Sequence, residues 1–155
     1  MNRRNFVMAL AGAAGVAGLG AATARADRWD YRRYRRNDVD ATIRRCEEST
    51  DRWVKVFDEQ LDNSVLNDSE REDRLNEKAR ELERALDRLR QDFNRRGESW
   101  WECRSSVADA LLNARGINNS VRSRNYRPHT KRLWALLRSD LNRLAYYYGL
   151  PGVPR

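Results

Sequence analysis

The chain has few of the residues that bind metals and haem. It carries two cysteines, one histidine and two methionines. It contains no Cys-x-x-Cys-His motif for covalent haem and no Glu-x-x-His motif for a di-iron site, which excludes the familiar helical bundles built on those groups. The single histidine, His129, follows Pro128, a position typical of a turn or helix cap rather than of a metal ligand. We therefore expect no cofactor, no metal site and no catalytic residue, and the sequence predicts a protein that is not an enzyme.

A strongly apolar run of membrane-spanning length is also absent. The nearest candidate is the uncharged stretch 6–22, but it is rich in Gly and Ala, whereas a span needs about 20 strongly apolar residues. Arg3 and Arg4 precede this stretch, and Ala24-Arg25-Ala26 follows it as a small-x-small cleavage site. We expect residues 1–26 to be a twin-arginine signal peptide that is cleaved, leaving no membrane span. An ordinary secretory signal and an uncleaved N-terminal anchor are the alternatives.

Removal of the signal changes the composition of the chain. Both methionines, Met1 and Met8, leave with it, which excludes a haem held by a His/Met pair. Three arginines and no acid also leave, so the net charge falls from +8 to +5. The remaining residues 27–155 suit one compact domain with a modest core. We expect this domain in the periplasm or outside the cell.

No segment shows the alternation of a β-strand, and four segments show the three-and-four spacing of amphipathic helices. Capping signals mark their ends. Ser69 with Glu72 and Ser99 with Glu102 form capping boxes, and Gly97 is suited to a left-handed C-cap. The predicted helices span about 38–63, 69–96, 99–123 and 129–148, and a short tail follows at 151–155.

Helices of this length joined by short turns predict an all-α fold, an up-down-up-down four-helix bundle over residues 37–150. A three-helix core with one peripheral helix is the alternative. Residues 27–36 alternate Arg with Trp and Tyr and lack an apolar stripe, so we expect a mobile basic and aromatic arm there. Such an arm could contact an anionic polymer or lipid headgroups, and export argues against a nucleic-acid partner.

Two cysteines in an exported chain indicate a disulfide between Cys46 and Cys103. Both fall in the first turns of predicted helices that run in the same direction, so their depths agree. A bridge of this loop length would stabilise the fold by roughly 4 kcal/mol. The two helices are diagonal in a regular bundle, however, which is too far apart for a bridge unless they become neighbours at that end. Two separate reduced thiols are the alternative, and the lack of a Cys-x-x-Cys motif argues against redox catalysis.

Acidic residues are absent from residues 110–139. This stretch includes the predicted turn between the last two helices, so one end of the bundle should be positively charged, and Asn118 and Tyr126 would add hydrogen-bonding groups there. We expect a site for an anion or a partner formed by Arg115, Arg122, Arg124, Arg127, Lys131 and Arg132. A solvated basic face without a binding role is the alternative.

Adjacent aromatic residues occur at Trp100-Trp101 and at Tyr146-Tyr147-Tyr148. Neighbours on a helix point in different directions, so not all of these rings can face one core. Some must line a groove, contact a partner or lie on the surface. Self-association of the protein is one use for such rings.

The last predicted helix carries the motif Trp134-x-x-Leu137-Arg138-x-Asp140-Leu141-Asn142-x-Leu144-Ala145-x-x-Tyr148. It resembles the closing motif of small exported helical proteins that carry twin-arginine signals and are common in soil bacteria. The resemblance implies a helical bundle and export. It implies no catalytic residues, because that group has no characterised activity, and the cysteine pair departs from its pattern.

These features predict an exported, non-enzymatic helical bundle that binds an anionic envelope polymer or an unfolded protein. A cofactor-binding or redox bundle is one alternative, because the twin-arginine route carries proteins that are already folded. A structural module that forms homo-oligomers is the other.

Overall fold

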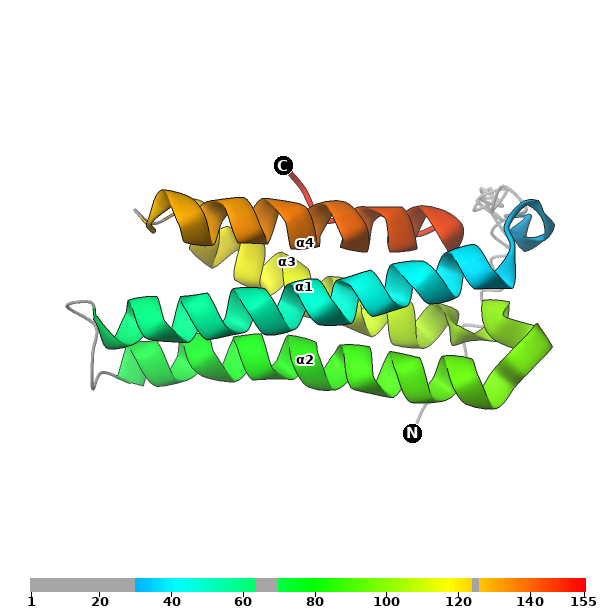
Figure 1. Cartoon of the computed structure of the whole chain (residues 1–155), viewed down its shortest axis with the longest axis horizontal. Helices are drawn as coiled ribbons and strands as arrows, with labels where there is room; N and C mark the ends of the chain where they lie inside the picture. The colour runs from blue at the N-terminus through cyan, green and yellow to red at the C-terminus, as the bar shows by residue number, and fades with distance from the viewer. Residues whose placement is uncertain (1–29, 64–69, 124–125) are drawn as a thin grey trace, which may run out of the picture.

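A computed structural model of the chain describes residues 30–63, 70–123 and 126–155. The predicted signal peptide lies outside the described residues. Within them every regular element is a helix, which confirms the all-helical class. The elements are the 3-10 helices η1 (Tyr31–Arg33) and η2 (Gly97–Cys103) and the α-helices α1 (Arg36–Asp62), α2 (Glu70–Arg96), α3 (Arg104–Arg122) and α4 (Pro128–Tyr147) (Figure 1). None of the described helices is both long enough and apolar enough to cross a membrane.

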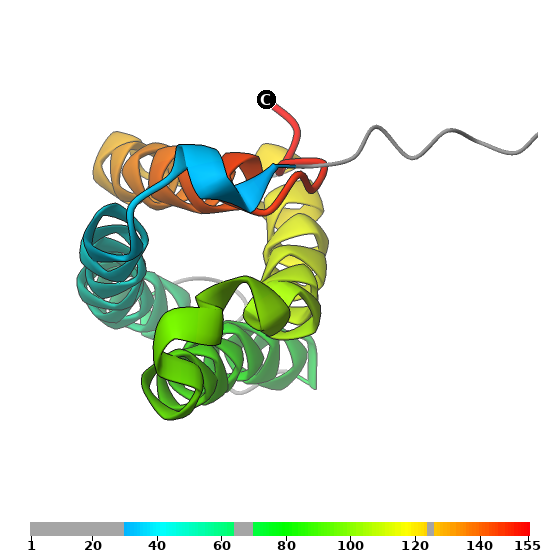
Figure 2. The same ribbon diagram turned by 90° about the vertical axis from the view of Figure 1, so that its right-hand side faces the viewer.

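The α-helices pack around a common axis. α1 packs against α2 and α4, and α3 packs against the same two helices. Seen along the long axis, α1 lies diagonally opposite α3, and α2 lies opposite α4 (Figure 2). α2, η2 and α3 follow one another without a break, so residues 70–122 form one helical stretch that reverses direction at η2.

The core consists of the apolar stripes that face this axis. The stripe predicted in α1 is buried from Val39 to Phe57, and Trp53 stacks on Phe57 with ring centroids 4.5 Å apart. The ring of Trp134, from α4, lies 4.9 Å from that of Trp53. Burial of one large apolar side chain contributes about 1.5 to 3 kcal/mol, so these rings stabilise the contact between α1 and α4.

The turn between α2 and α3 differs from the prediction. Gly97 has φ +53°, as expected for a left-handed C-cap. The capping box at Ser99 does not begin an α-helix, however, because η2 follows and α3 begins at Arg104. A 3-10 helix repeats every three residues, which places Trp100 and Cys103 on one side, and both are buried. The need to bury this pair explains the tighter turn.

The predicted mobile arm also differs from the structure over its described part. Its η1 segment packs against the adjacent aromatic residues noted in the sequence. The Tyr31 ring stacks on Trp101 at 4.1 Å, and the Tyr34 ring lies 5.5 Å from Tyr146 and 5.0 Å from Tyr147. Most of these adjacent rings are therefore used in packing within the chain, although Tyr146 stays 67 % exposed.

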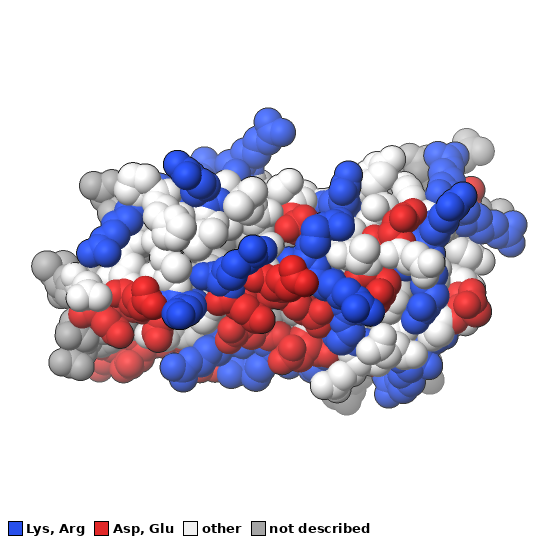
Figure 3. Space-filling view, in the orientation of Figure 1, with Lys and Arg blue, Asp and Glu red and all other residues white. Residues whose placement is uncertain are grey.

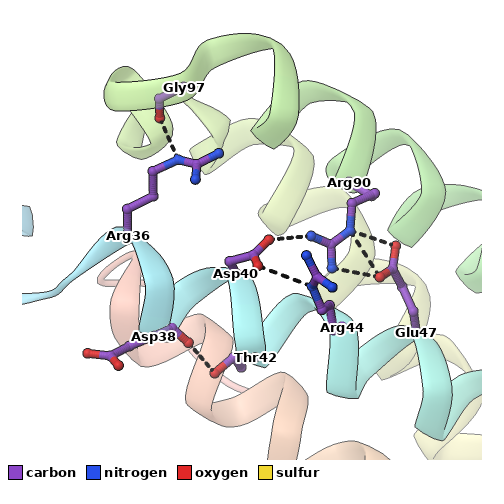
Figure 4. A network of polar contacts seen from close by, with 8 residues as sticks. All are labelled: Arg36, Asp38, Asp40, Thr42, Arg44, Glu47, Arg90 and Gly97. Carbon is purple, nitrogen blue, oxygen red and sulfur yellow. Dashed lines mark hydrogen bonds and ion pairs between the residues drawn. The ribbon is translucent and has the colours of Figure 1, made fainter.

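Charged side chains fix α1 against α2 (Figure 4). Arg90 of α2 donates hydrogen bonds to both carboxylate oxygens of Glu47 and, at 2.6 Å, to Asp40. The Arg90 side chain is only 17 % exposed, so water screens these ion pairs less than it screens surface pairs. Near η2, Arg36 Nε donates to the Gly97 carbonyl at 3.0 Å, which ties the start of α1 to the turn.

Candidate functional site

Four of the six residues predicted to bind an anion lie together at one end of the molecule. Arg122 is the last residue of α3, Arg127 precedes α4, and Lys131 and Arg132 are in the first turns of α4. All four side chains are exposed. Arg124 lies outside the described residues. We call Arg122, Arg127, Lys131 and Arg132 the basic end.

The start of α4 is held by a side chain from α1. The Gln60 amide oxygen accepts a hydrogen bond from the Arg127 backbone N–H at 3.2 Å and another from the Thr130 hydroxyl at 2.5 Å. An N–H at a helix start has no partner within the helix, so Gln60 serves as its cap. No local sequence pattern could predict this cap, because its residues are 67 positions apart.

An acidic surface adjoins the basic end. α1 ends and α2 begins at the same end of the molecule, and the exposed side chains there include Glu59, Asp62, Glu70 and Asp73. The space-filling view shows acidic side chains gathered over α1 and α2 in the middle of the face (Figure 3). On the side formed by α1 and α2 basic and acidic side chains are mixed (Figure 3), whereas the basic end on α3 and α4 lies in a stretch of sequence without acidic residues.

Three residues that the sequence placed near the basic end are engaged in other contacts. Asn118 is fully buried, and Tyr126 is 5 % exposed with its ring 5.4 Å from that of Phe57. Arg115 binds the C-terminal segment of the chain. These three side chains are not available to an anion at the basic end. Arg115 and Asn118 contact the tail because the chain beyond α4 folds back over α3, which the sequence does not show, and Tyr126 packs against Phe57 of α1.

This C-terminal tail, residues 150–155, is held by two asparagines. Asn142 of α4 binds the backbone of Val153 with both amide groups, since its Oδ1 accepts from the N–H at 2.6 Å and its Nδ2 donates to the carbonyl at 3.1 Å. Asn118 of α3 donates to the Pro154 carbonyl at 3.1 Å, and its Oδ1 accepts from the Trp134 indole at 2.9 Å. Each amide offers both a donor and an acceptor, which lets one side chain satisfy two groups.

Two arginines complete this surface. Arg115 of α3 donates to two consecutive carbonyls of the tail, the second being that of Gly152 at 3.3 Å. Arg138 of α4 donates to the Pro154 carbonyl at 3.4 Å. Each carbonyl from residue 151 to residue 154 therefore has a side-chain donor. We call Arg115, Asn118, Arg138 and Asn142 the tail site.

Two residues of the tail are restricted by their surroundings. Val153 is 2 % exposed and belongs to the core. A Cβ atom on Gly152 would lie 2.5 Å from Asn142 Oδ1 and 3.0 Å from its Cγ, which is closer than Cβ atoms come to such neighbours. Glycine thus allows the tail to approach the Asn142 amide.

Sequence reasoning treated residues 151–155 as a tail without a role and missed the tail site. One signal was present, because Val153 is an apolar residue set between glycine and proline beyond the end of a helix. The binding side chains themselves gave no signal. Only the fold brings Asn118 of α3 and Asn142 of α4 to the same segment.

A depression between α1 and α2 is lined by the carboxylates of Glu47, Asp51, Glu83 and Asp87 and by the arginines Arg80 and Arg84. Burial, followed by the charges of Asp87 and Glu47, raises the pKa of Asp51. Burial, followed by the charges of Asp51 and Asp87, raises the pKa of Glu83. Among the described residues, no group of His, Cys, Asp or Glu is arranged to hold a metal ion. Burial and the neighbouring carboxylates thus outweigh the opposing effect of Arg80 and Arg84 on the pKa of Glu83.

The predicted disulfide is wrong, because Cys46 and Cys103 are both buried free thiols. Cys46 interacts electrostatically with Asp140, and Cys103 interacts with Tyr148, about 12 Å further along α4. The thiols thus differ in depth, and α1 and α3 stay diagonal. Burial raises the pKa of Cys103 to about 11 and raises that of Cys46 further, so neither is a reactive thiolate at neutral pH.

Comparisons with known proteins give no match from which a function could be inferred. No protein-family model matches the chain. No curated protein and no solved structure matches it either.

Proposed function

We propose that this chain is an exported, non-enzymatic protein whose mature part is an up-down-up-down four-helix bundle, and that the basic end binds an anionic envelope polymer. Export is inferred from the twin-arginine signal predicted at residues 1–26. One observation carries the binding proposal. The four side chains of the basic end are exposed, and within the described part of the chain none of them forms an ion pair.

Some basic side chains elsewhere on the molecule have acidic partners, and others, such as Arg52 and Lys55 of α1, have acidic residues close by in the sequence. Arg84 pairs with Glu77 along α2, and Arg90 pairs with Asp40 and Glu47 across to α1. The basic end lies instead in a stretch with no acid between residues 110 and 139. Its positive charge is therefore not neutralised by neighbours along the sequence, and it is free to attract an anion.

A polymer fits these side chains better than a small anion does. A single exposed ion pair contributes only about 0.2 to 1 kcal/mol, so one anionic group would be held weakly. A chain with repeated negative charges can contact several of the four cations at once, and the later contacts become intramolecular. The acidic surface over α1 and α2 repels the same polymer and directs it to the side of α3 and α4.

The test replaces Arg122, Arg127, Lys131 and Arg132 with Ser together. Fluorescence anisotropy with labelled poly-L-glutamate measures binding at low and at high salt. The wild-type protein should bind at low salt and lose affinity steeply as salt rises. The variant should bind at least about tenfold more weakly, because several ion pairs are lost.

A matched control removes the same charge from other helices. Arg52, Lys55, Lys78 and Arg88 are exposed on α1 and α2, and their joint replacement by Ser lowers the net charge equally. The control variant should bind poly-L-glutamate within about twofold of wild type if the basic end is the site. Equal losses in the two variants, or no binding by the wild type, would overturn the proposal.

A further inference from the structure

The tail site holds a polypeptide by its backbone. Its four side chains hydrogen-bond to successive carbonyls and one N–H of the tail, and none of these bonds involves a tail side chain. Backbone contacts do not depend on sequence, so the same groups can bind another extended segment of similar shape. The surface has the properties of a peptide-binding site that is filled by residues 150–155 of the same chain.

The shape of the tail site restricts the sequence that it accepts. One position favours glycine, because a Cβ atom there would lie 2.5 Å from Asn142 Oδ1 and would force the Asn142 side chain or the segment to move. The next position places an apolar side chain in the core, as Val153 does. Pro151 and Pro154 lack a backbone N–H, so the segment presents more acceptors than donors. The tail site supplies mainly donors and therefore matches a segment that contains proline.

We propose that the tail site binds extended Gly-apolar-Pro segments of other polypeptides, and that the tail occupies the site when no such segment is bound. Unfolded chains supply such segments, because they expose extended stretches that folded proteins bury. The proposal does not rest on the function proposed for the basic end, since the two sites share no residue.

Attachment to α4 gives the tail an advantage over a free segment. The tail leaves α4 through Gly149, which has φ +58°, and Arg104 donates to the carbonyls of Tyr148 and Gly149. This fixed turn holds the tail close to its site at a high effective concentration. A free segment must therefore compete with the tail, and release of the tail should strengthen its binding.

The experiment uses the full chain and a fluorescein-labelled peptide with the sequence of residues 149–155. Val153→Asp should release the tail, because an unpaired carboxylate cannot be buried in the core. The peptide should bind the Val153→Asp protein at least about tenfold more tightly than it binds wild type, since the attached competitor is gone. Adding Asn142→Ala to the released protein should weaken peptide binding at least about tenfold.

Controls distinguish binding at the tail site from binding elsewhere on the protein. A peptide with Leu in place of the glycine should not bind, because its side chain meets Asn142. Gly152→Leu in the protein releases the tail by the same clash and keeps Val153, so it provides a second released protein if Val153→Asp does not fold. Replacement of the basic end by Ser should leave peptide binding unchanged.

Three results would overturn the proposal. The first is failure of the peptide to bind either released protein while circular dichroism shows native helix content. The second is equal binding with and without Asn142→Ala. The third is a wild-type dimer in light scattering that Val153→Asp abolishes, because the site would then take the tail of a second copy rather than another polypeptide.

Discussion

Asn142 of α4 binds the backbone of Val153, and Gly152 leaves no space for a side chain beside the Asn142 amide. The Asn142 amide hydrogen-bonds to both the N–H and the carbonyl of Val153. A side chain on Gly152 would collide with this amide. The same argument separates this glycine from Gly116, where an added Cβ would meet no atom within 4 Å.

Gly152→Ala should destabilise the protein by about 1 to 3 kcal/mol, because the new methyl group forces Asn142 or the tail to move. Gly116→Ala is the matched control. It should stabilise the protein by about 0.5 to 1 kcal/mol, since alanine favours the interior of α3. Urea unfolding followed by circular dichroism measures both changes. Equal effects of the two substitutions would contradict the close approach at Gly152.

Burial of single residues was predictable where it depends on local spacing. Val39, Ile43 and Trp53 follow the three-and-four spacing of one helix face, and all three are buried as expected. Asn118 and Val153 are buried because segments far apart in the sequence meet, which local spacing cannot reveal.

At the scale of elements, Arg90 links α1 and α2 through two carboxylates. Arg90→Ala should destabilise the protein by about 2 kcal/mol, because it leaves Asp40 and Glu47 without their partner in a partly shielded position. Thermal unfolding of the variant and of the wild type measures this loss of stability. The control is Arg84→Ala, which removes an exposed pair with Glu77 and should cost about 0.5 kcal/mol or less. If both variants cost the same, the shielded network does not fix these helices.

The helices themselves were predictable, and the segments between them were not. Helix ends from the capping signals agree with the structure to within a few residues at the end of α2 and at both ends of α4. The segment at Ser99 has the sequence of a helix start but forms η2, because burial of Trp100 and Cys103 outweighs the capping signal. The predicted disulfide assumed that Cys46 and Cys103 lie equally far along their helices. That comparison took Ser99 as the start of α3, whereas α3 begins at Arg104.

At the scale of the whole molecule, the acidic surface over α1 and α2 makes stability depend on pH. The raised pKa of Glu83 means that the folded protein holds this proton more tightly than the unfolded chain does. Its contribution is therefore greatest in acid and declines as pH rises through the raised pKa. Glu83→Gln should raise the melting temperature at pH 7, and the gain should disappear below about pH 4.

A carboxylate on the same helix provides a control of opposite sign. The hydrogen bond from the Ser106 hydroxyl, followed by nearby arginines, lowers the pKa of Asp92. Its stabilising contribution is present above the pKa of the unfolded chain and is lost as pH falls. Asp92→Asn should therefore lower the melting temperature at pH 7. Stabilisation by both substitutions would contradict the stabilising role assigned to the contacts of Asp92 with Ser106 and the nearby arginines.

The all-helical class followed from the sequence because helical periodicity is a local property. Of the predicted basic residues, the four of the basic end lie at one end of the molecule because a short turn joins α3 to α4. The position of Arg115 could not be predicted, since it depends on a tail that the sequence marks only with glycine and proline.

The tail also has a mechanical role, because it receives hydrogen bonds from both α3 and α4. These two helices have the least extensive direct contact of the neighbouring α-helix pairs. The hydrogen bonds of the tail therefore add to the contact between two helices that have little direct contact. Any segment that replaces the tail must contact both α3 and α4. Binding of that segment and separation of the two helices are therefore coupled equilibria, and tighter binding makes separation of the helices less favourable.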